Sequence, residues 1–303
     1  MLSIFALPKP FRGHIGVIQN NAIRSWLALR PPCEIILFGD EDGTAETAAR
    51  YGIRHIPEVD CNEYGTPLVN SLFNAAQELA SHELMCYINA DIILMSDFLP
   101  SVQQVPNQMF LLVGRRWDID LNEPIDFNTG TWETNLRNYV QVSGTLHQPT
   151  GIDYFVFPRG MYRDIPAFAI ARSAWDNWLV YRARILRIPV IDATKAINAV
   201  HQNHDYGHHP MGRKGIWRGV EAKYNRELLG GRKHSFNLLD ATYILTPDTL
   251  KAARSARNIF RRLGILLETY TISIPLAEIV TGLLRLHTFS LSLVSKKPGL
   301  GWR

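Results

Sequence analysis

The first ninety residues alternate short apolar runs with helical patterns, and this alternation most limits what the chain can fold into. Apolar, strand-like runs cover residues 3–7, 34–38, 53–59 and 84–88, and helical patterns cover residues 15–29, 44–51 and 67–80. Strands that alternate with helices through short connections favour a parallel sheet with helices on both faces. The chain is therefore predicted to adopt an α/β fold.

Signals in the rest of the chain are weaker. Further strands are predicted at 110–113, 154–157 and 188–191, and a further helix at 174–186. The polar stretch 118–149 has no clear period and is predicted to be a long loop, which in a compact domain usually serves function. After Pro247 the chain looks helical. We therefore divide it into a body, residues 1–247, and a helical tail, residues 248–303.

The net charge of +4 is distributed unevenly between the body and the tail. Residues 1–250 hold 23 basic and 26 acidic side chains, and residues 251–303 hold nine and two, which gives −3 and +7. An acidic body argues against binding of nucleic acid, which needs a clustered cationic face. The tail alternates apolar and basic residues. This pattern is typical of an interfacial helix on anionic lipid, and equally of a helix packed on the body or on a partner chain.

Three scattered cysteines, Cys33, Cys61 and Cys86, indicate reduced thiols. No apolar run reaches the roughly 20 residues that span a bilayer, and the N-terminus lacks the features of a signal peptide. These features predict a cytoplasmic protein, with the tail as its candidate contact with the inner face of the membrane.

The segment Glu83–Asp91 carries the clearest chemical signal in the sequence. It places Asn89 and Asp91 at the end of a buried strand, where alternation points both side chains the same way. Ligands of parallel α/β sheets bind at the carboxyl ends of the strands, which here correspond to residues 8–12, 39–42 and 89–91. A bound ligand is therefore expected to meet Asn89 and Asp91.

Four separated segments together resemble the nucleotide-sugar-dependent glycosyltransferases of the GT-A fold, above all the large inverting family with a D-x-D strand end. They are the helix with Asn74 followed by Glu83, Asn89 and Asp91; the acidic loop 38–44; the small-residue turn 166–170; and Trp175, Asp176, Arg182 and His201. Asn89 stands where the family has its first aspartate, and Trp175 replaces the first member of an acidic pair. The resemblance implies a single Rossmann-like mixed sheet, with a nucleotide-binding half at 1–100 and an acceptor half at 101–247.

The resemblance also implies a divalent cation, Mn²⁺ or Mg²⁺, that bridges the donor diphosphate. Asp91 would bind it through oxygen, with His201 as a further ligand and His204 as the fallback. The run 201–209 is rich in histidine, so a zinc site is an alternative, although it lacks paired cysteines and an H-E-x-x-H spacing. A plain polar surface loop is the other alternative.

Asp176 is the expected general base, which takes the proton of the acceptor hydroxyl during direct displacement at the anomeric carbon. The competing interpretation is structural, because Ser173 and Asp176 resemble a capping box at the start of a helix. Expected acceptor contacts are Asp153, Tyr154 and Trp175. Expected donor contacts are Leu7, Arg12, Asp40, Asp42, Asn74 and Asn89.

The predicted function is metal-dependent transfer of a sugar, with inversion, from a UDP- or GDP-sugar to a hydroxyl acceptor. One alternative is a sugar-phosphate nucleotidyltransferase. It is disfavoured because the loop 8–13 holds a single glycine, where such enzymes carry a glycine-rich phosphate loop. The other alternative is a non-catalytic, membrane-associated protein that binds sugar nucleotides, since Asn89 and the single acid Asp176 both depart from the family pattern.

Overall fold

The computed structural model describes residues 1–106, 109–204, 217–254 and 258–261. The chain divides into two compact units, Met1–Ala253 and Arg254–Arg303, and the elements below belong to the first. In the described residues, no helix is both long and apolar enough to cross a membrane. The predicted tail from residue 262 onward lies outside the described residues.

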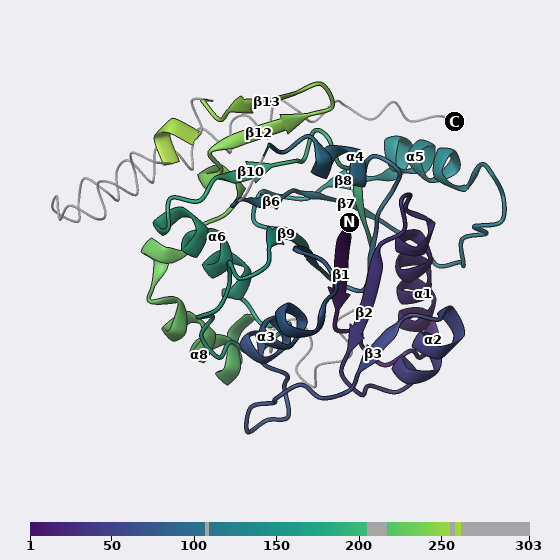
Figure 1. Ribbon diagram of the computed structural model, residues 1–303, viewed down its shortest axis with the longest axis horizontal. Helices are drawn as coiled ribbons and strands as arrows, with labels where there is room; N and C mark the ends of the chain where they lie inside the picture. The colour runs from purple at the N-terminus through teal and green to yellow at the C-terminus, as the bar shows by residue number, and fades with distance from the viewer. Residues whose placement is uncertain (107–108, 205–216, 255–257, 262–303) are drawn as a thin grey trace, which may run out of the picture. The chain divides into compact units, whose positions relative to one another are not determined.

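A nine-stranded mixed sheet forms the centre of the first unit (Figure 1). Its strand order is β13-β12-β10-β6-β9-β4-β1-β2-β3, and only β9 and β13 run antiparallel to their neighbours. The strands are β1 (Leu2–Ala6), β2 (Glu34–Phe38), β3 (Arg54–Ile56), β4 (Leu84–Ile88), β6 (Leu111–Val113), β9 (Tyr154–Pro158), β10 (Val190–Asp192), β12 (Tyr243–Thr246) and β13 (Thr249–Ala252). The carboxyl ends of β1, β2 and β4 therefore meet the beginning of β9 at one edge.

The large mixed sheet confirms the predicted α/β fold, and a second, four-stranded sheet with the order β5-β11-β7-β8 accompanies it. Its strands are β5 (Ile92–Ile93), β11 (Ala199–Gln202), β7 (Arg116–Ile119) and β8 (Thr145–Leu146). These strands are two to four residues long, too short to show an alternating pattern in the sequence. Because β5 follows β4 almost directly, the small sheet begins at the edge where β4 ends.

Helices cover both faces of the large sheet, as the alternation of strands and helices predicts. They are α1 (Gly13–Ala28), α2 (Thr44–Tyr51), α3 (Val69–Leu79), α4 (Phe98–Gln103), α6 (Trp175–Ile185) and α8 (Val220–Leu229). A further helix, α5 (Trp132–Ser143), packs against the small sheet. Figure 1 shows α1 and α2 on one side of β1 and β2, and α3, α6 and α8 on the other. The predicted stop of α2 at Gly52 is confirmed, because that residue has a φ of 64°, which glycine adopts without strain.

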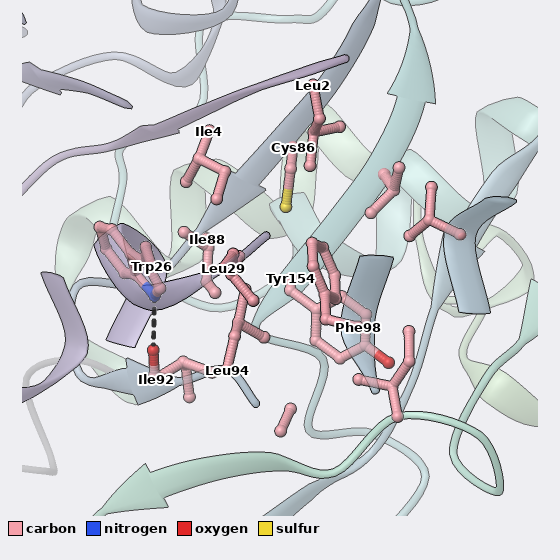
Figure 2. Close-up of a cluster of buried hydrophobic side chains, with 14 of the residues drawn as sticks. Leu2, Ile4, Trp26, Leu29, Cys86, Ile88, Ile92, Leu94, Phe98 and Tyr154 are labelled. Atoms are coloured by element: carbon pink, nitrogen blue, oxygen red, sulfur yellow. Dashed lines mark hydrogen bonds between the residues drawn. The ribbon is translucent and has the colours of Figure 1, made fainter. Parts of the chain in front are cut away.

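Alternate residues of the central strands face two different cores. Leu2 and Ile4 point toward α1 and pack with Trp26 (Figure 2), whose indole Nε1 donates to the carbonyl of Ile92 at 2.9 Å. Phe5 points the other way and meets Phe73 of α3 edge to face, with ring centroids 5.2 Å apart. Each such buried side chain contributes on the order of 1.5–3 kcal/mol. The first core therefore ties α1 to the small sheet, and the second fixes α3 on the opposite face.

Two predictions of local structure are wrong. The stretch 118–149 is not one long loop, because it contains β8 and α5. In α5, Leu136 and Val140 lie one turn apart and pack against the small sheet. The prediction of a helix directly after Pro247 is also wrong. The residues after Pro247-Asp248 form β13, which pairs with β12 in a hairpin. Proline followed by aspartate suits such a turn.

Candidate active site

A cavity of about 790 Å³ opens at the edge where β1, β2 and β4 end. One wall is formed by the β1–α1 loop and the end of β4, including Lys9 and Asp91. Another part of the wall is formed by the beginning of α6, including Trp175 and Asp176. This is the location that ligands favour in open α/β sheets. The cavity therefore brings the two principal carboxylates of the sequence prediction to one site.

Asp91, His201 and His204 converge at the β4 wall. Oδ2 of Asp91 lies 3.1 Å from Nε2 of His204 and 3.8 Å from Nε2 of His201. The three residues offer ligand atoms that all lie within 4.8 Å of one another. His201 reaches this place because β11 pairs with β5, with His201 opposite Ile92 and so next to Asp91 in space.

The donor set fits a divalent cation. The Oδ1 atom of Asp91 is buried, yet it has no hydrogen-bond partner among the described residues. A buried carboxylate oxygen without a partner is costly unless something else binds it. One carboxylate with two imidazoles suits Mn²⁺ better than Mg²⁺, which prefers oxygen ligands, and it is also compatible with Zn²⁺.

Neighbouring polar groups hold Asp91 in its charged form. Burial alone would raise the pKa of this carboxyl, but the charge of His201, the hydrogen bond from His204 and the charge of Lys9 outweigh it and lower the pKa well below its usual range. Asp91 is therefore an anion throughout the pH range in which proteins work.

Lys9 was missed as a site residue by the sequence reasoning. Its Nζ atom lies 3.2 Å from Nε2 of His204, at the wall that carries Asp91. Its backbone is fixed by the buried Gln19 of α1, which accepts from the Lys9 amide at 2.6 Å and donates to its carbonyl at 2.8 Å. The available signal was its position as the first charged residue after β1. A fixed cation beside a candidate metal site can bind phosphate.

Asn89 and Asp153 face each other where β4 ends and β9 begins. Nδ2 of Asn89 donates to Oδ1 of Asp153 at 2.6 Å, and Oδ1 of Asn89 accepts from the hydroxyl of Tyr87 at 2.9 Å. The other carboxylate oxygen of Asp153 accepts from Arg116 at 2.6 Å. Asn89 and Asp153 both line the cavity. The antiparallel pairing of β4 with β9 places them side by side.

Asp176 lies in the first turn of α6. Burial raises its pKa to about 7, backbone N–H groups at the start of the helix lower it again in part, and the negative charge of Asp153 adds to the rise. The capping box is not formed, because the N-cap residue is Ala174 and no side chain caps the helix. Capping by Ser173 therefore does not explain Asp176.

Trp175 and Tyr154 lie in different surroundings. Trp175 lines the cavity and packs edge to face on Tyr87, with ring centroids 5.3 Å apart. Tyr154 is fully buried and packs on Phe98 in the core on the α1 side, so the expected acceptor contact is wrong. The physical reason is strand alternation, because Asp153 and Phe155 take the cavity-side positions of this segment.

The expected donor contacts are only partly brought together. Leu7 lines the cavity, whereas Asn74 is exposed on α3 and is not part of the lining. Arg12 and Asp42 form an exposed ion pair of 2.7 Å beside the cavity, and Asp40 is exposed in the same loop. Glu41 lines the cavity instead. The sequence indicated the acidic loop but not which of its acids lines the cavity.

No family model and no curated protein matches this sequence. Solved structures similar to the chain include TarS from S. aureus, at 11% identity over 67% of this chain and a TM-score of 0.40. They also include the mannosyltransferase PcManGT from Pyrobaculum calidifontis in complex with GDP-Man and Mn²⁺, at 12% identity over 66% of this chain and a TM-score of 0.39. A third is glucosyl-3-phosphoglycerate synthase from Mycobacterium tuberculosis in complex with Mn²⁺ and UDP, at 13% identity over 77% of this chain and a TM-score of 0.42.

This chain covers 57% of the TarS structure, 56% of PcManGT and 81% of the mycobacterial synthase. The matched structures include enzymes of the class that the sequence motifs resemble. At these identities and TM-scores, however, the likeness assigns neither an activity nor a residue role. The function of this chain is therefore inferred from its own residues.

Proposed function

We propose that the protein is a metal-dependent glycosyltransferase that moves a sugar from a UDP- or GDP-sugar to a hydroxyl acceptor, with inversion at the anomeric carbon. The observation that carries the proposal is one cavity lined by two carboxyl groups in different environments. One is Asp91, which forms a cluster with His201 and His204, and the other is Asp176, whose pKa is about 7. Direct displacement of a diphosphate needs stabilisation of the leaving group on one face and a base on the opposite face.

Asp91, His201 and His204 would hold the divalent cation of the donor complex. When bound, the cation supplies Lewis-acid stabilisation of the departing diphosphate. The unpartnered Oδ1 atom of Asp91 and the two imidazole nitrogens support this assignment. Lys9 would bind a phosphate oxygen beside the cation, because its ammonium lies 3.2 Å from His204 and its backbone is fixed. Two positive centres oppose the repulsion between the diphosphate and Asp91.

Asp176 would accept the proton of the acceptor hydroxyl. A base is most effective when its pKa lies near the working pH, because it is then both deprotonated and a strong enough acceptor. Burial and the charge of Asp153 bring Asp176 to that range. Asp153 and Asn89, which also line the cavity, would bind the hydroxyls of the sugar, and Trp175 would form part of the acceptor platform.

The test is nucleotide release from UDP- and GDP-sugars, followed with and without Mn²⁺ and across a panel of hydroxyl acceptors. We expect Mn²⁺-dependent release that Asp91→Ala abolishes. The control is Asp97→Asn, which removes an ion-paired carboxylate that is not part of the cavity lining. Metal analysis of the purified protein distinguishes zinc from exchangeable manganese.

Two outcomes would overturn the proposal. Formation of a sugar nucleotide and pyrophosphate from a sugar phosphate and a nucleoside triphosphate would establish a nucleotidyltransferase. Tight, metal-independent binding of a sugar nucleotide, with no turnover in the presence of any acceptor, would establish a binding protein.

A further inference from the structure

Asp118 contacts His201 of the candidate metal cluster and takes no part in the reaction proposed above. It is on β7, which pairs in parallel with β11, and its register partner is His201. Oδ1 of Asp118 lies 3.1 Å from Nδ1 of His201, the ring nitrogen on the far side from Asp91. The contact is too bent for a regular hydrogen bond, yet it is close enough for an ion pair. A carboxylate therefore stands directly behind a candidate metal ligand.

Asp118 is itself held by two further groups. Nε of Arg116 donates to Oδ1 at 2.9 Å, and Nδ1 of His147 lies 2.6 Å from Oδ2. Pairing of β8 with β7 brings His147 to this place. Asp118 is thus held in place on both of its carboxylate oxygens.

A neutral imidazole carries one N–H, and its neighbours decide which nitrogen bears it. An anion beside Nδ1 favours the proton there, which leaves the lone pair on Nε2. In His201 that lone pair faces Asp91, 3.8 Å away. Histidine ligands of metals are commonly oriented in this way by a carboxylate that does not touch the metal.

We infer that Asp118 is the positioning residue of the metal site: it sets the tautomer and the orientation of His201, so that Nε2 is presented to the cation. The inference rests on the proposed function, because it assigns a support to the cation site proposed there. Arg116 links Asp118 to Asp153, which lines the cavity. Its NH1 group donates to Asp153 at 2.6 Å while its Nε atom holds Asp118.

The first test measures Mn²⁺ binding in the absence of nucleotide, by the electron paramagnetic resonance of free Mn²⁺. Loss of a supporting carboxylate typically costs about 10–100-fold in metal affinity, and we expect that loss for Asp118→Asn. The matched control is Asp97→Asn, because Asp97 also pairs with an arginine, at 2.9 Å, and is 19% exposed against 18% for Asp118. The control should bind Mn²⁺ as the wild type does.

Two comparisons separate a positioning role from damage to the fold. Asp118→Glu keeps the negative charge and should recover part of the lost affinity. In the presence of saturating Mn²⁺, Asp118→Asn should recover most of its kcat, because the cation is then restored by mass action. Equal Mn²⁺ affinity in the wild type and Asp118→Asn would overturn the inference, and so would equal losses in Asp118→Asn and Asp97→Asn.

The second test needs no variant of Asp118. Long-range ¹H–¹⁵N correlation spectra report which ring nitrogen of a histidine is protonated, and His201→Gln assigns the signal. We expect the Nδ1–H form of His201 in the wild type, and the Nε2–H form would refute the inference whatever the stability of the variants. If the wild type binds no divalent cation with or without UDP, the proposed function fails. If it binds one and Asp118→Asn binds it equally, only the positioning role fails.

Discussion

The carboxylate on the β4 side of the cavity and the carboxylate on the α6 side are held by different partners. Asp91 lies among His201, His204 and Lys9, which keep its pKa far below neutrality. The charged group that acts most strongly on Asp176 is another acid, Asp153, and the pKa rises to about 7. Both side chains line the same cavity. Burial raises the pKa of both carboxyls. The groups around Asp91 outweigh this effect, whereas the charge of Asp153 adds to it at Asp176.

This difference separates a permanent anion from a group that exchanges a proton. A permanent anion can bind a cation at every working pH, and a carboxyl that titrates near neutrality can act as a base. The two residues are therefore expected to fail in different ways when they are changed. Substitutions on the β4 side should affect binding, and substitutions on the α6 side should affect turnover.

The largest expected effect is that of Asp176→Asn. Asparagine keeps the shape of the side chain but cannot accept the hydroxyl proton, and general-base catalysis is worth about 10²–10⁴-fold. We expect kcat to fall by that factor, while Mn²⁺ and UDP affinities stay within about twofold of the wild type. Steady-state kinetics and calorimetric titration measure the two quantities. A large loss of UDP affinity, or of folded protein, would instead make Asp176 a structural residue.

The next largest effect is the dependence of activity on pH. Asp176 must lose its proton to act, so log kcat/KM should fall with a slope of one below about pH 7, roughly tenfold per pH unit, and level off above. Asp91 contributes nothing to this profile, because its pKa lies far lower. A profile that is flat from pH 5.5 to 8.5 would remove Asp176 from the role of base.

The same shift makes a prediction for stability. The folded-state pKa of Asp176 is raised above its unfolded value of about 3.9, so the folded state retains this proton where the unfolded state has lost it. Stability from this group is therefore present at low pH and is lost between about pH 4 and pH 7. Asp176→Asn, which cannot ionise, should gain Tm relative to the wild type across that window and keep a constant advantage above it. Thermal unfolding from pH 4 to 8 measures this difference.

On the β4 side, Lys9→Met should weaken binding of the donor nucleotide. A hydrogen bond to a charged group contributes about 1.5–3 kcal/mol, so the UDP dissociation constant should rise about tenfold or more. Mn²⁺ affinity without nucleotide should not fall, because lysine is not a ligand and its charge repels the cation. A loss of Mn²⁺ affinity in Lys9→Met would instead mean that Lys9 supports the fold of the cluster.

Local patterns of strand and helix predicted the parts of the site that lie at the ends of long elements. Asp91 follows a five-residue apolar strand, and Asp176 lies in the first turn of an eleven-residue helix. Asp118 and His147 were missed because they lie in a stretch predicted as a loop. Its strands are only four and two residues long, and the longer one, β7, contains charged side chains. β7 pairs with β11, a contact far away in the sequence, and β8 pairs with β7.

Which face of a strand meets the cavity is also hidden in the sequence. β9 is buried on both faces, so its residues show no polar and apolar alternation. The wrong expectation for Tyr154 follows from this, because only the three-dimensional position of α6 decides that Asp153 and Phe155 face the cavity side. The same holds for the loop after β2, where Glu41 lines the cavity and its two acidic neighbours do not.

The same loop contains an acid in an ion pair, Asp42, and an acid that lines the cavity, Glu41. Substitutions of these two residues give the smallest expected effects on nucleotide binding. Asp42 forms an ion pair with Arg12 in which both side chains are exposed, 60% and 76%, and such pairs contribute little. Glu41 faces the cavity, so its carboxylate can accept a hydrogen bond from the ribose or base of the donor. We expect Glu41→Gln to raise the UDP dissociation constant about fivefold, and Asp42→Asn to change it by less than about twofold. If the two effects are reversed, the donor extends over the exposed pair and the nucleotide lies outside the cavity at this end.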